Sequence, residues 1–217
     1  MKKNNEKIGE IIQILRQEYS KAKTALHYKT PFQLLIATIL SAQCTDERVN
    51  QITPQLFSKY QSAADFASAI QEELEEEIRS TGFFRNKAKN IIGASKKIVN
   101  DFGGNIPDSM EQLITLPGVA RKTANIVLSS AFHKAEGIAV DVHVKRLAQR
   151  LGLSSQNNPD KIEKDLMALI SRQDWIDFNY LIVNHGRSIC KARKPLCPDC
   201  VLKHLCPSRE KFYPDLA

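Results

Sequence analysis

The sequence lacks the features that mark a membrane-spanning or secreted chain. Nowhere in its 217 residues does an apolar run approach the roughly 18 to 20 residues that cross a bilayer. The N-terminal segment MKKNNEKIGEIIQIL carries two lysines, but it has neither an uninterrupted apolar core nor a small-residue cleavage site. These absences favour a cytosolic protein with no membrane partner.

Signs of β-structure are also missing. No convincing alternation of apolar and polar residues occurs, and there is neither an internal repeat nor a low-complexity segment. Helical spacing dominates instead, and one N-terminal helix should bury the face formed by Ile8, Ile11, Ile12 and Leu15. The sequence therefore predicts an all-α fold of about ten helices.

Helix start signals place several of these elements. Thr30 is followed by Pro31 and Gln33, which is a cap, a first-turn proline and a capping-box residue. The helix that follows, PFQLLIATILSA, is apolar nearly all round and should be buried on most sides. Asp108 or Ser109 can cap a later helix. Further helices are expected over about 46–60, up to about 80, after about 84, and over 142–151, 159–170 and 175–188.

The charge balance moderately favours a polyanionic partner. Thirty-one Lys and Arg against 24 Asp and Glu give a net charge of +7 and a pI near 9.1. Five acids crowd into residues 72–77, so the rest of the chain is more basic than the total suggests. A basic run without acids consists of Arg85, Lys87, Lys89, Lys96 and Lys97. This run is either a contact surface for the polyanion or a solvated helix face.

Four of the five cysteines lie close together near the C-terminus. Cytosolic thiols stay reduced, so such crowding indicates a metal site rather than disulfides. The spacing C-x6-C-x2-C-x5-C of Cys190, Cys197, Cys200 and Cys206 suits a [4Fe–4S] cluster better than zinc, although spacing alone leaves both open. We expect His204 to be exposed or a cap rather than a ligand, and Cys44 to be a buried free thiol.

The loop between the first two of these cysteines is basic. It contains Lys191, Arg193 and Lys194, which a metal centre that fixes the loop would present to phosphates. The alternative is that these cations only balance the negative charge of the thiolates.

A tight turn joins two predicted helices at Pro117 to Ala120. Leu116 and Val119 are placed to pack the turn inward, and Gly118 supplies backbone freedom. The N–H groups of Gly118 to Ala120 should then face outward at a helix N-terminus, beside Arg121, where they would form a seat for a phosphate. A proline–glycine turn between helices is common, so the alternative to phosphate binding is that the turn only connects the two helices.

Lys122 and Asp141 each allow two interpretations. Lys122 follows Arg121 at a helix N-terminus, where partial desolvation would favour the neutral amine that a Schiff-base nucleophile needs. Most lysines are nevertheless solvated and inert. Asp141 precedes a helix and is expected to be its N-cap, a role that does not exclude catalysis. His143 is expected to be structural or to support a catalytic neighbour.

Four stretches occur together in the order of one known family. They are LSAQCTD at 40–46, LPGVARKTAN at 116–125, AVDVHV at 139–144 and the cysteine pattern at 190–206. In these stretches the chain resembles endonuclease III, the helix–hairpin–helix DNA glycosylase and AP lyase of base excision repair. The likeness covers about residues 8–210, and the four motifs together are very specific.

The resemblance implies two α-helical domains on either side of a DNA-binding cleft. One would be a six-helix barrel over 24–134 with the helix–hairpin–helix, and the other would combine 1–23 with 135–217 and hold a [4Fe–4S] cluster. The partner would be double-stranded DNA with damaged bases or abasic sites. The protein would be a monomer of the bacterial cytosol or nucleoid.

The resemblance also implies the chemistry. Lys122 would attack C1′ of the damaged pyrimidine nucleotide and form a Schiff base, Asp141 would assist, and β-elimination would cut the strand on the 3′ side. Gln43 matches the residue that fills the hole left by the flipped base. Phe83 aligns with an apolar wedge, or else packs into the barrel.

Two positions depart from the family pattern, and both bear on function. Ala120 stands where a second hairpin glycine is common, which is harmless if that position does not need a positive φ. Val142 stands where threonine is common, which leaves the base preference open. The alternatives are a mismatch-directed thymine or uracil glycosylase of the same fold, and a non-catalytic DNA-binding module with a structural metal site.

Overall fold

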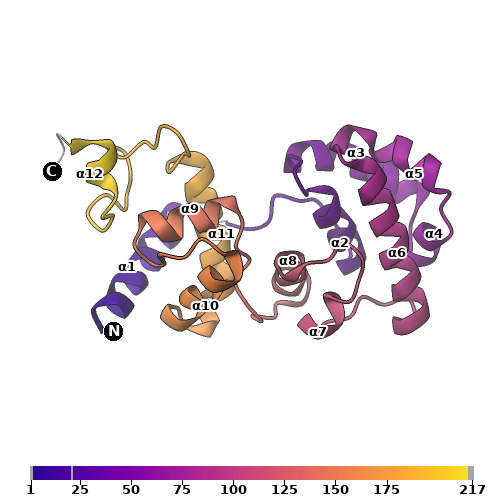
Figure 1. The fold of residues 1–217 in the computed structure, drawn as a ribbon, viewed down its shortest axis with the longest axis horizontal. Helices are drawn as coiled ribbons and strands as arrows, with labels where there is room; N and C mark the ends of the chain where they lie inside the picture. The colour runs from indigo at the N-terminus through magenta and orange to yellow at the C-terminus, as the bar shows by residue number, and fades with distance from the viewer. Residues whose placement is uncertain (1, 21, 215–217) are drawn as a thin grey trace. The chain divides into compact units, whose positions relative to one another are not determined.

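The computed structural model describes residues 2–20 and 22–214, and all of its regular elements in these ranges are helices (Figure 1). Twelve α-helices and two 3-10 helices occur in this part of the chain. The chain divides into two compact units. We call Thr24–Glu136 the central unit, and Met1–Lys23 with Gly137–Ala217 the terminal unit. The all-α prediction is confirmed.

The central unit surrounds α2 (Pro31–Leu40), which lies at the core of this unit. Leu34, Leu35 and Ile36 have no exposed surface, as the nearly continuous apolar sequence predicts. The Thr30 hydroxyl accepts a hydrogen bond from the Gln33 N–H and so caps the helix. The other helices of the unit are α3 (Asp46–Lys59), α4 (Ala63–Ala67), α5 (Gln71–Ile78), η1 (Arg79–Thr81), α6 (Phe84–Phe102), α7 (Met110–Leu113) and α8 (Arg121–Phe132).

Helix α4 is an element that helical periodicity does not reveal, because it has only five residues. A capping box defines it. The Ser62 hydroxyl accepts from the Asp65 N–H, and the Asp65 carboxylate accepts from the Ser62 N–H. Phe66 then buries its whole side chain against the core.

The terminal unit is built from both the N-terminal and the C-terminal part of the chain. Its helices are α1 (Lys2–Glu18), α9 (Val142–Arg150), α10 (Pro159–Leu169), η2 (Arg172–Asp174), α11 (Trp175–Ser188) and α12 (Arg209–Phe212). Helix α1 packs against α10 and α11 through the predicted apolar face of Ile8, Ile11, Ile12 and Leu15. The N-terminal helix is therefore part of the same core as helices more than 140 residues further along the chain.

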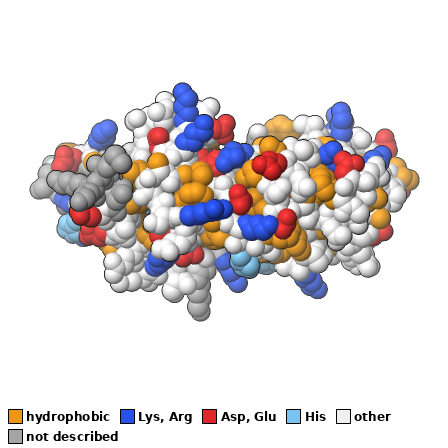
Figure 2. All heavy atoms as spheres, turned by 90° about the horizontal axis from the view of Figure 1, so that it is seen from below, with side chains coloured by type: hydrophobic (Ala, Val, Ile, Leu, Met, Phe, Trp, Pro, Cys, Tyr) orange, Lys and Arg blue, Asp and Glu red, His pale blue; other side chains and the backbone are white. Residues whose placement is uncertain are grey.

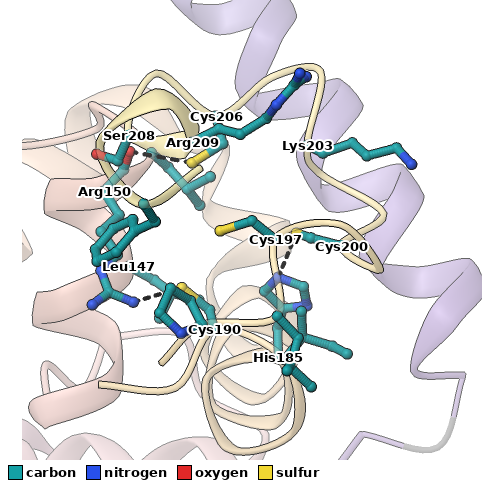
Figure 3. A pocket seen from close by; sticks show the side chains of 15 residues that line it. Leu147, Arg150, His185, Cys190, Cys197, Cys200, Lys203, Cys206, Ser208 and Arg209 are labelled. Atoms are coloured by element: carbon teal, nitrogen blue, oxygen red, sulfur yellow. Dashed lines mark hydrogen bonds between the residues drawn. The ribbon is translucent and has the colours of Figure 1, made fainter. Parts of the chain in front are cut away.

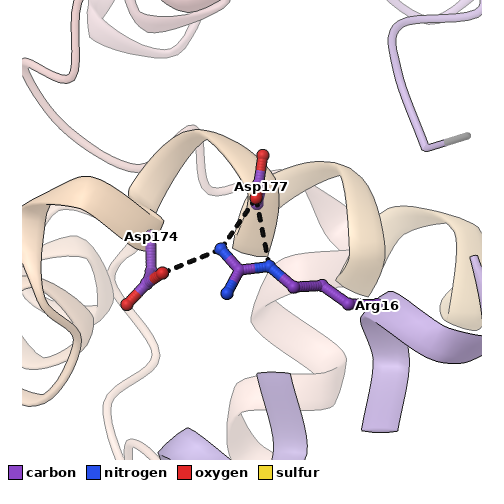
Figure 4. Close-up of polar contacts among 3 residues, drawn as sticks. All are labelled: Arg16, Asp174 and Asp177. Atoms are coloured by element: carbon purple, nitrogen blue, oxygen red, sulfur yellow. Dashed lines mark hydrogen bonds and ion pairs between the residues drawn. The ribbon is translucent and has the colours of Figure 1, made fainter. Parts of the chain in front are cut away.

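An ion-pair triad fixes the end of α1 to α11. The Arg16 guanidinium donates to Asp174 at 2.8 Å and to Asp177 at 2.7 and 3.1 Å (Figure 4). The hydrogen bonds from Arg16 to Asp177 and to Asp174 raise the pKa of the guanidinium. Because the Arg16 side chain is 45% exposed, this triad positions α1 more than it stabilises the fold.

Two further properties of the described residues concern helix length and surface charge. None of the helices in the described residues is both long and apolar enough to cross a membrane. On the face drawn in Figure 2, the Lys and Arg side chains are interspersed with Asp and Glu rather than gathered in one patch. This face is therefore not a uniformly basic surface.

Candidate functional site

The turn between α7 and α8 has the geometry that the sequence predicts. Leu116 and Val119 are buried, at 2% and 6% exposure, and hold the turn against the core. Gly118 has a φ of +76°, and a Cβ added there would lie 2.8 Å from the Asn90 Cβ. Glycine is therefore required at position 118 both by backbone conformation and by space.

The amide groups of this hairpin divide into two kinds. Within residues 2–20 and 22–214, the N–H groups of Gly118 and Ala120 have no hydrogen-bond partner. The Val119 N–H instead donates to the Leu116 carbonyl at 3.1 Å, so the expectation that it faces outward is wrong. Ala120 has a φ of −88°, a value that alanine adopts without strain, so the departure from glycine is harmless here.

Helix α8 begins at this turn without a side-chain cap. Its N-cap is Ala120, whose methyl group accepts no hydrogen bond, so the first turn offers donors to an external acceptor. Arg121 is the first residue of the helix and is exposed. Such an N-terminus, next to the two unpaired hairpin amides, has the properties of an anion-binding site.

Lys122 is the second residue of α8, and its side chain is exposed. The expectation that it is partly desolvated is wrong for the structure as described. Its amine is accessible to a partner at the N-terminal end of α8, directly after Arg121.

Asp141 is the N-cap of α9, as expected. One oxygen, Oδ1, accepts from the N–H groups of both His143 and Val144 at 2.8 Å. The structure gives the other oxygen, Oδ2, no hydrogen bond within the described ranges. The carboxylate is thus held rigid through one oxygen and keeps the other for a further partner. Asp141 belongs to the terminal unit and Lys122 to the central unit.

The histidine after Asp141 is structural, as expected. The Arg146 guanidinium lies 3.1 Å from His143 Nδ1 and donates to the Gly186 carbonyl at 2.9 Å. Burial lowers the pKa of His143 despite the nearby Asp141 charge, so the imidazole is neutral at physiological pH. Through Arg146, His143 at the start of α9 is therefore connected to Gly186 of α11.

Gln43 and Phe83 are both exposed side chains on short connections of the central unit. Gln43 lies between α2 and α3, and Phe83 directly precedes α6. Phe83 is 65% exposed, so the alternative that it packs into the barrel is wrong. An exposed phenylalanine at a helix start is available to contact a partner.

The four C-terminal cysteines line one pocket, although the segment that carries them has little regular structure (Figure 3). Burial raises the pKa of the Cys200 thiol to about 11, and burial also raises the pKa of Cys197 and Cys206. A bound metal would supply the positive charge that converts such partly buried thiols to thiolates. Their surroundings therefore fit a metal centre.

Two contacts that the sequence does not reveal support these cysteines. His185 of α11 places Nε2 3.4 Å from the Cys200 sulfur, and Arg150 of α9 donates to the Cys190 sulfur at 3.3 Å (Figure 3). Burial lowers the pKa of His185 to about 4, so the imidazole beside the Cys200 sulfur is neutral. Its position four residues after Leu181, on the apolar face of α11, was the one available signal that it is buried.

The remaining thiol and histidine candidates do not belong to this pocket. His204 is exposed and lines a different pocket, as expected of a residue that is not a ligand. Cys44 packs against the core of the central unit and is half-buried rather than buried.

The four cysteines supply the ligand set that an iron–sulfur cluster takes. Among the described residues, no group of three or more His, Cys, Asp or Glu side chains has the geometry of a single-ion site. Four cysteine thiolates are the ligands that hold a [4Fe–4S] cluster. Cys190, Cys197, Cys200 and Cys206 line one pocket and provide these thiolates.

The basic loop between the first two cysteines is held by its backbone. Arg150 donates to the Lys191 and Ala192 carbonyls, at 2.8 Å each. The side chains of Lys191, Arg193 and Lys194 are exposed and do not line the cysteine pocket. Arg150 thus donates both to a cysteine sulfur and to the loop backbone, and the three exposed loop cations remain available to a partner.

Comparisons with known proteins agree with this geometry. Residues 36–172 match the HhH-GPD superfamily of base excision DNA repair proteins, and residues 190–206 match the iron-sulfur binding domain of endonuclease III. The second match begins at Cys190 and ends at Cys206, so it spans all four cysteines. An iron–sulfur cluster is therefore the cofactor of this chain.

Relatives of similar length align with nearly the whole chain. An endonuclease III of Synechocystis is 57% identical over 97% of this chain and 96% of the relative. A trapped endonuclease III–DNA covalent intermediate has a TM-score of 0.91 at 40% identity, covering 95% of this chain and 97% of that one. A thermostable thymine-DNA glycosylase has a TM-score of 0.86 at 25% identity, covering 95% and 98%. The chain belongs to the HhH-GPD superfamily of base excision DNA repair proteins and, within it, to the endonuclease III family.

Proposed function

We propose that the protein is a bifunctional DNA glycosylase and AP lyase of base excision repair. It removes oxidised pyrimidines from duplex DNA and then cuts the strand 3′ to the abasic site by β-elimination. The observation that carries this proposal is the exposed Lys122 amine at the uncapped start of α8, directly after a hairpin with two unpaired amides. Its family relatives, which include an enzyme trapped covalently on DNA, support a covalent mechanism.

Lys122 acts as the nucleophile. Its neutral amine attacks C1′, and the bond from C1′ to the damaged base breaks, so the base leaves with a proton. Ring opening of the sugar gives an imine between Lys122 Nζ and C1′. Removal of a proton from C2′ then expels the 3′ phosphate, which cuts the strand, and water releases the lysine.

Asp141 assists the first step through Oδ2. A carboxylate held by the start of α9 accepts a proton from the attacking amine and stabilises the positive charge that develops on the sugar. The cap contacts fix Oδ1, so the orientation of the acting oxygen is preorganised. Capping and catalysis thus use different oxygens of one side chain.

Two separate parts of the chain hold the DNA backbone. The Gly118 and Ala120 amides with Arg121 bind a phosphate at the start of α8. Lys191, Arg193 and Lys194 bind further phosphates from the loop that Arg150 and the cysteines fix. Val119 contributes through its packing under the turn, since its own amide is already bonded.

Gln43 and Phe83 stabilise the duplex after the target nucleotide is flipped out. Extrusion of a base leaves a hole and two disrupted stacks. The exposed Gln43 fills that hole by hydrogen bonding, and the exposed Phe83 enters the stack as an apolar wedge.

Cys190, Cys197, Cys200 and Cys206 hold the cluster. When bound, the [4Fe–4S] group supplies electron-transfer capacity and a fixed centre around which 190–206 folds. Arg150 donates to the Cys190 sulfur, His185 contacts the Cys200 sulfur, and both side chains orient these ligands. For function, the bound cluster would hold the basic loop between Cys190 and Cys197 rigid.

A mismatch-directed thymine or uracil glycosylase is the second candidate. Val142, directly after Asp141, is 72% exposed, an apolar side chain that suits the methyl group of thymine. The likeness to a thermostable thymine-DNA glycosylase supports this alternative. Because the relatives are bacterial proteins, we infer that either enzyme works in the bacterial cytoplasm on the nucleoid.

A substrate panel decides between these functions. Duplexes carrying an oxidised pyrimidine, a thymine or uracil mismatch, or an abasic site would be incubated with the protein, and base release and strand cleavage measured separately. We expect release and cleavage on the oxidised pyrimidine and cleavage at the abasic site. Release from mismatches alone would favour the second candidate, and absence of cleavage at abasic sites would contradict the lyase.

A further inference from the structure

Gln43 and Phe83, the two exposed residues proposed to enter the duplex, share an unusual backbone conformation. Among the described residues, only three non-glycine residues have a positive φ, and Gln43 at +52° and Phe83 at +48° are two of them. The third, His133, is an ordinary left-handed helix C-cap. Phe83 is a helix N-cap, a position that usually has extended backbone. Such strain persists only where the surrounding structure determines it.

One buried side chain connects the segments that carry both residues. Lys87 of α6 is 4% exposed, and its Nζ donates to the Leu40 carbonyl at 2.7 Å and to the Thr81 carbonyl at 2.8 Å. Leu40 ends α2 three positions before Gln43, and Thr81 ends η1 two positions before Phe83. The sequence placed Lys87 in a basic run that was either solvated or in contact with a polyanion, and both alternatives are wrong for this residue.

The main chain completes the connection. The Lys87 N–H donates to the Phe83 carbonyl at 3.1 Å, so the same residue holds the Phe83 segment at two points. On the other segment, the Cys44 N–H donates to the Ser41 carbonyl at 3.1 Å and closes the turn around Gln43. Both turns are therefore fixed relative to one atom, Lys87 Nζ.

Burying a lysine carries an unfavourable desolvation free energy. Burial lowers the pKa of Lys87, and within the described ranges it makes no ion pair. An apolar side chain would fill the same volume without that penalty. What the ammonium group provides in return is a pair of directional bonds to two backbone segments, one of them at the negative end of α2.

We propose that Lys87 is a positioning residue that sets the distance and orientation between Gln43 and Phe83, and thereby the preference for damaged over intact duplex. This inference rests on the proposed function, in which Gln43 and Phe83 enter the space and the stack that a flipped nucleotide leaves. Lys87 itself lies beneath both segments and does not contact the DNA.

The test is a double-mutant cycle on binding. Lys87→Met keeps the length of the side chain and removes its donors. Dissociation constants would be measured for a duplex with a tetrahydrofuran abasic analogue, which cannot be cleaved, and for the same duplex intact. We expect Lys87→Met to lower the ratio of the two affinities about tenfold, and to reduce the further effects of Gln43→Ala and Phe83→Ala to less than about twofold.

Two controls separate positioning from general damage. Lys59→Met removes two surface hydrogen bonds, to Glu73 and Glu77, on the same unit and should leave the ratio unchanged. Affinity for intact duplex should also stay unchanged in Lys87→Met, since phosphate contacts are elsewhere. If Lys87→Met does not fold, Lys87→Gln, whose shorter amide reaches one carbonyl at most, takes its place with the same expected result.

The outcomes distinguish this inference from the proposed function. If wild type prefers the abasic duplex and Gln43→Ala and Phe83→Ala reduce that preference, but Lys87→Met does not, the role of Lys87 is overturned and the proposed function stands. If Lys87→Met reduces the ratio while the effects of Gln43→Ala and Phe83→Ala stay additive, Lys87 does not act through them, and the inference is again overturned. If wild type shows no preference, both fail.

Discussion

Replacing Asp141 separates its two roles, because they depend on different properties of the side chain. The cap needs an acceptor at Oδ1, which asparagine also supplies, whereas the proposed chemistry needs the negative charge at Oδ2. Asp141→Asn should therefore fold like the wild type and lose excision. Asp141→Ala should lose both the cap and excision.

The expected stability changes follow from the cap geometry. Asparagine caps about as well as aspartate, so Asp141→Asn loses only the attraction of the charge to the helix dipole, about 0.3–1 kcal/mol. Asp141→Ala also loses the two N–H contacts and should cost about 0.5–2 kcal/mol. In a chain of this size each kcal/mol lowers Tm by about 2–4 °C, so even the alanine variant should stay folded at assay temperature.

The activity change should be far larger than these stability changes explain. Removing one preorganised charge from a site where positive charge develops costs about 100-fold or more in rate. Single-turnover release of an oxidised pyrimidine would be measured beside thermal unfolding and binding to the tetrahydrofuran duplex. We expect a loss of about 100-fold in both variants, with binding retained.

Asn158→Ala is the matched control. Asn158 caps α10 of the same unit through one oxygen that accepts from the Asp160 and Lys161 N–H groups, at 2.9 and 3.1 Å. Asn158→Ala should lower the free energy of unfolding about as much as Asp141→Ala does, and it should leave excision unchanged. Full excision by Asp141→Asn would refute the reasoning and reduce Asp141 to a cap.

Two further predictions follow from the hairpin and the cysteine pocket. Gly118→Ala forces a methyl group to 2.8 Å from Asn90 at a φ of +76°. It should destabilise the protein by about 1–3 kcal/mol and weaken duplex binding. The control Gly9→Ala, in open space on α1, should instead stabilise the protein by about 0.5–1 kcal/mol. Unchanged unfolding and binding in Gly118→Ala would contradict the close approach to Asn90. The purified protein should be yellow-brown and contain iron and sulfide, and Cys200→Ser should bleach it; a colourless zinc protein would contradict the cluster.

Features that rest on local chemistry were predictable from the sequence. Thr30 and Asp141 cap helices because short polar side chains reach the N–H groups two or three residues ahead. The buried faces of α1 and α2 follow from their apolar spacing, and the spacing of the four cysteines indicated a metal site. In each case the signal lies within a few residues of the feature.

Features that rest on distant contacts were not predictable. Lys87 stands in a basic run, yet helical spacing places it between Phe84 and Ile91, and only the fold brings the Leu40 carbonyl to it. Nothing in the residue types of Gln43 or Phe83 signals a left-handed backbone, because that conformation is imposed by the elements around them. The five-residue helix α4 is too short for periodicity to reveal.

The central claim is that Lys122 forms a covalent imine with the sugar, and borohydride trapping tests it most directly. Protein, duplex with an oxidised pyrimidine or an abasic site, and borohydride would be combined, and the adduct resolved by denaturing electrophoresis and mapped by mass spectrometry. We expect a stable adduct on Lys122, absent in Lys122→Ala, with Lys134→Ala as a control that removes a surface lysine of the same unit. No adduct with the intact protein, or an adduct that survives Lys122→Ala, would contradict the account.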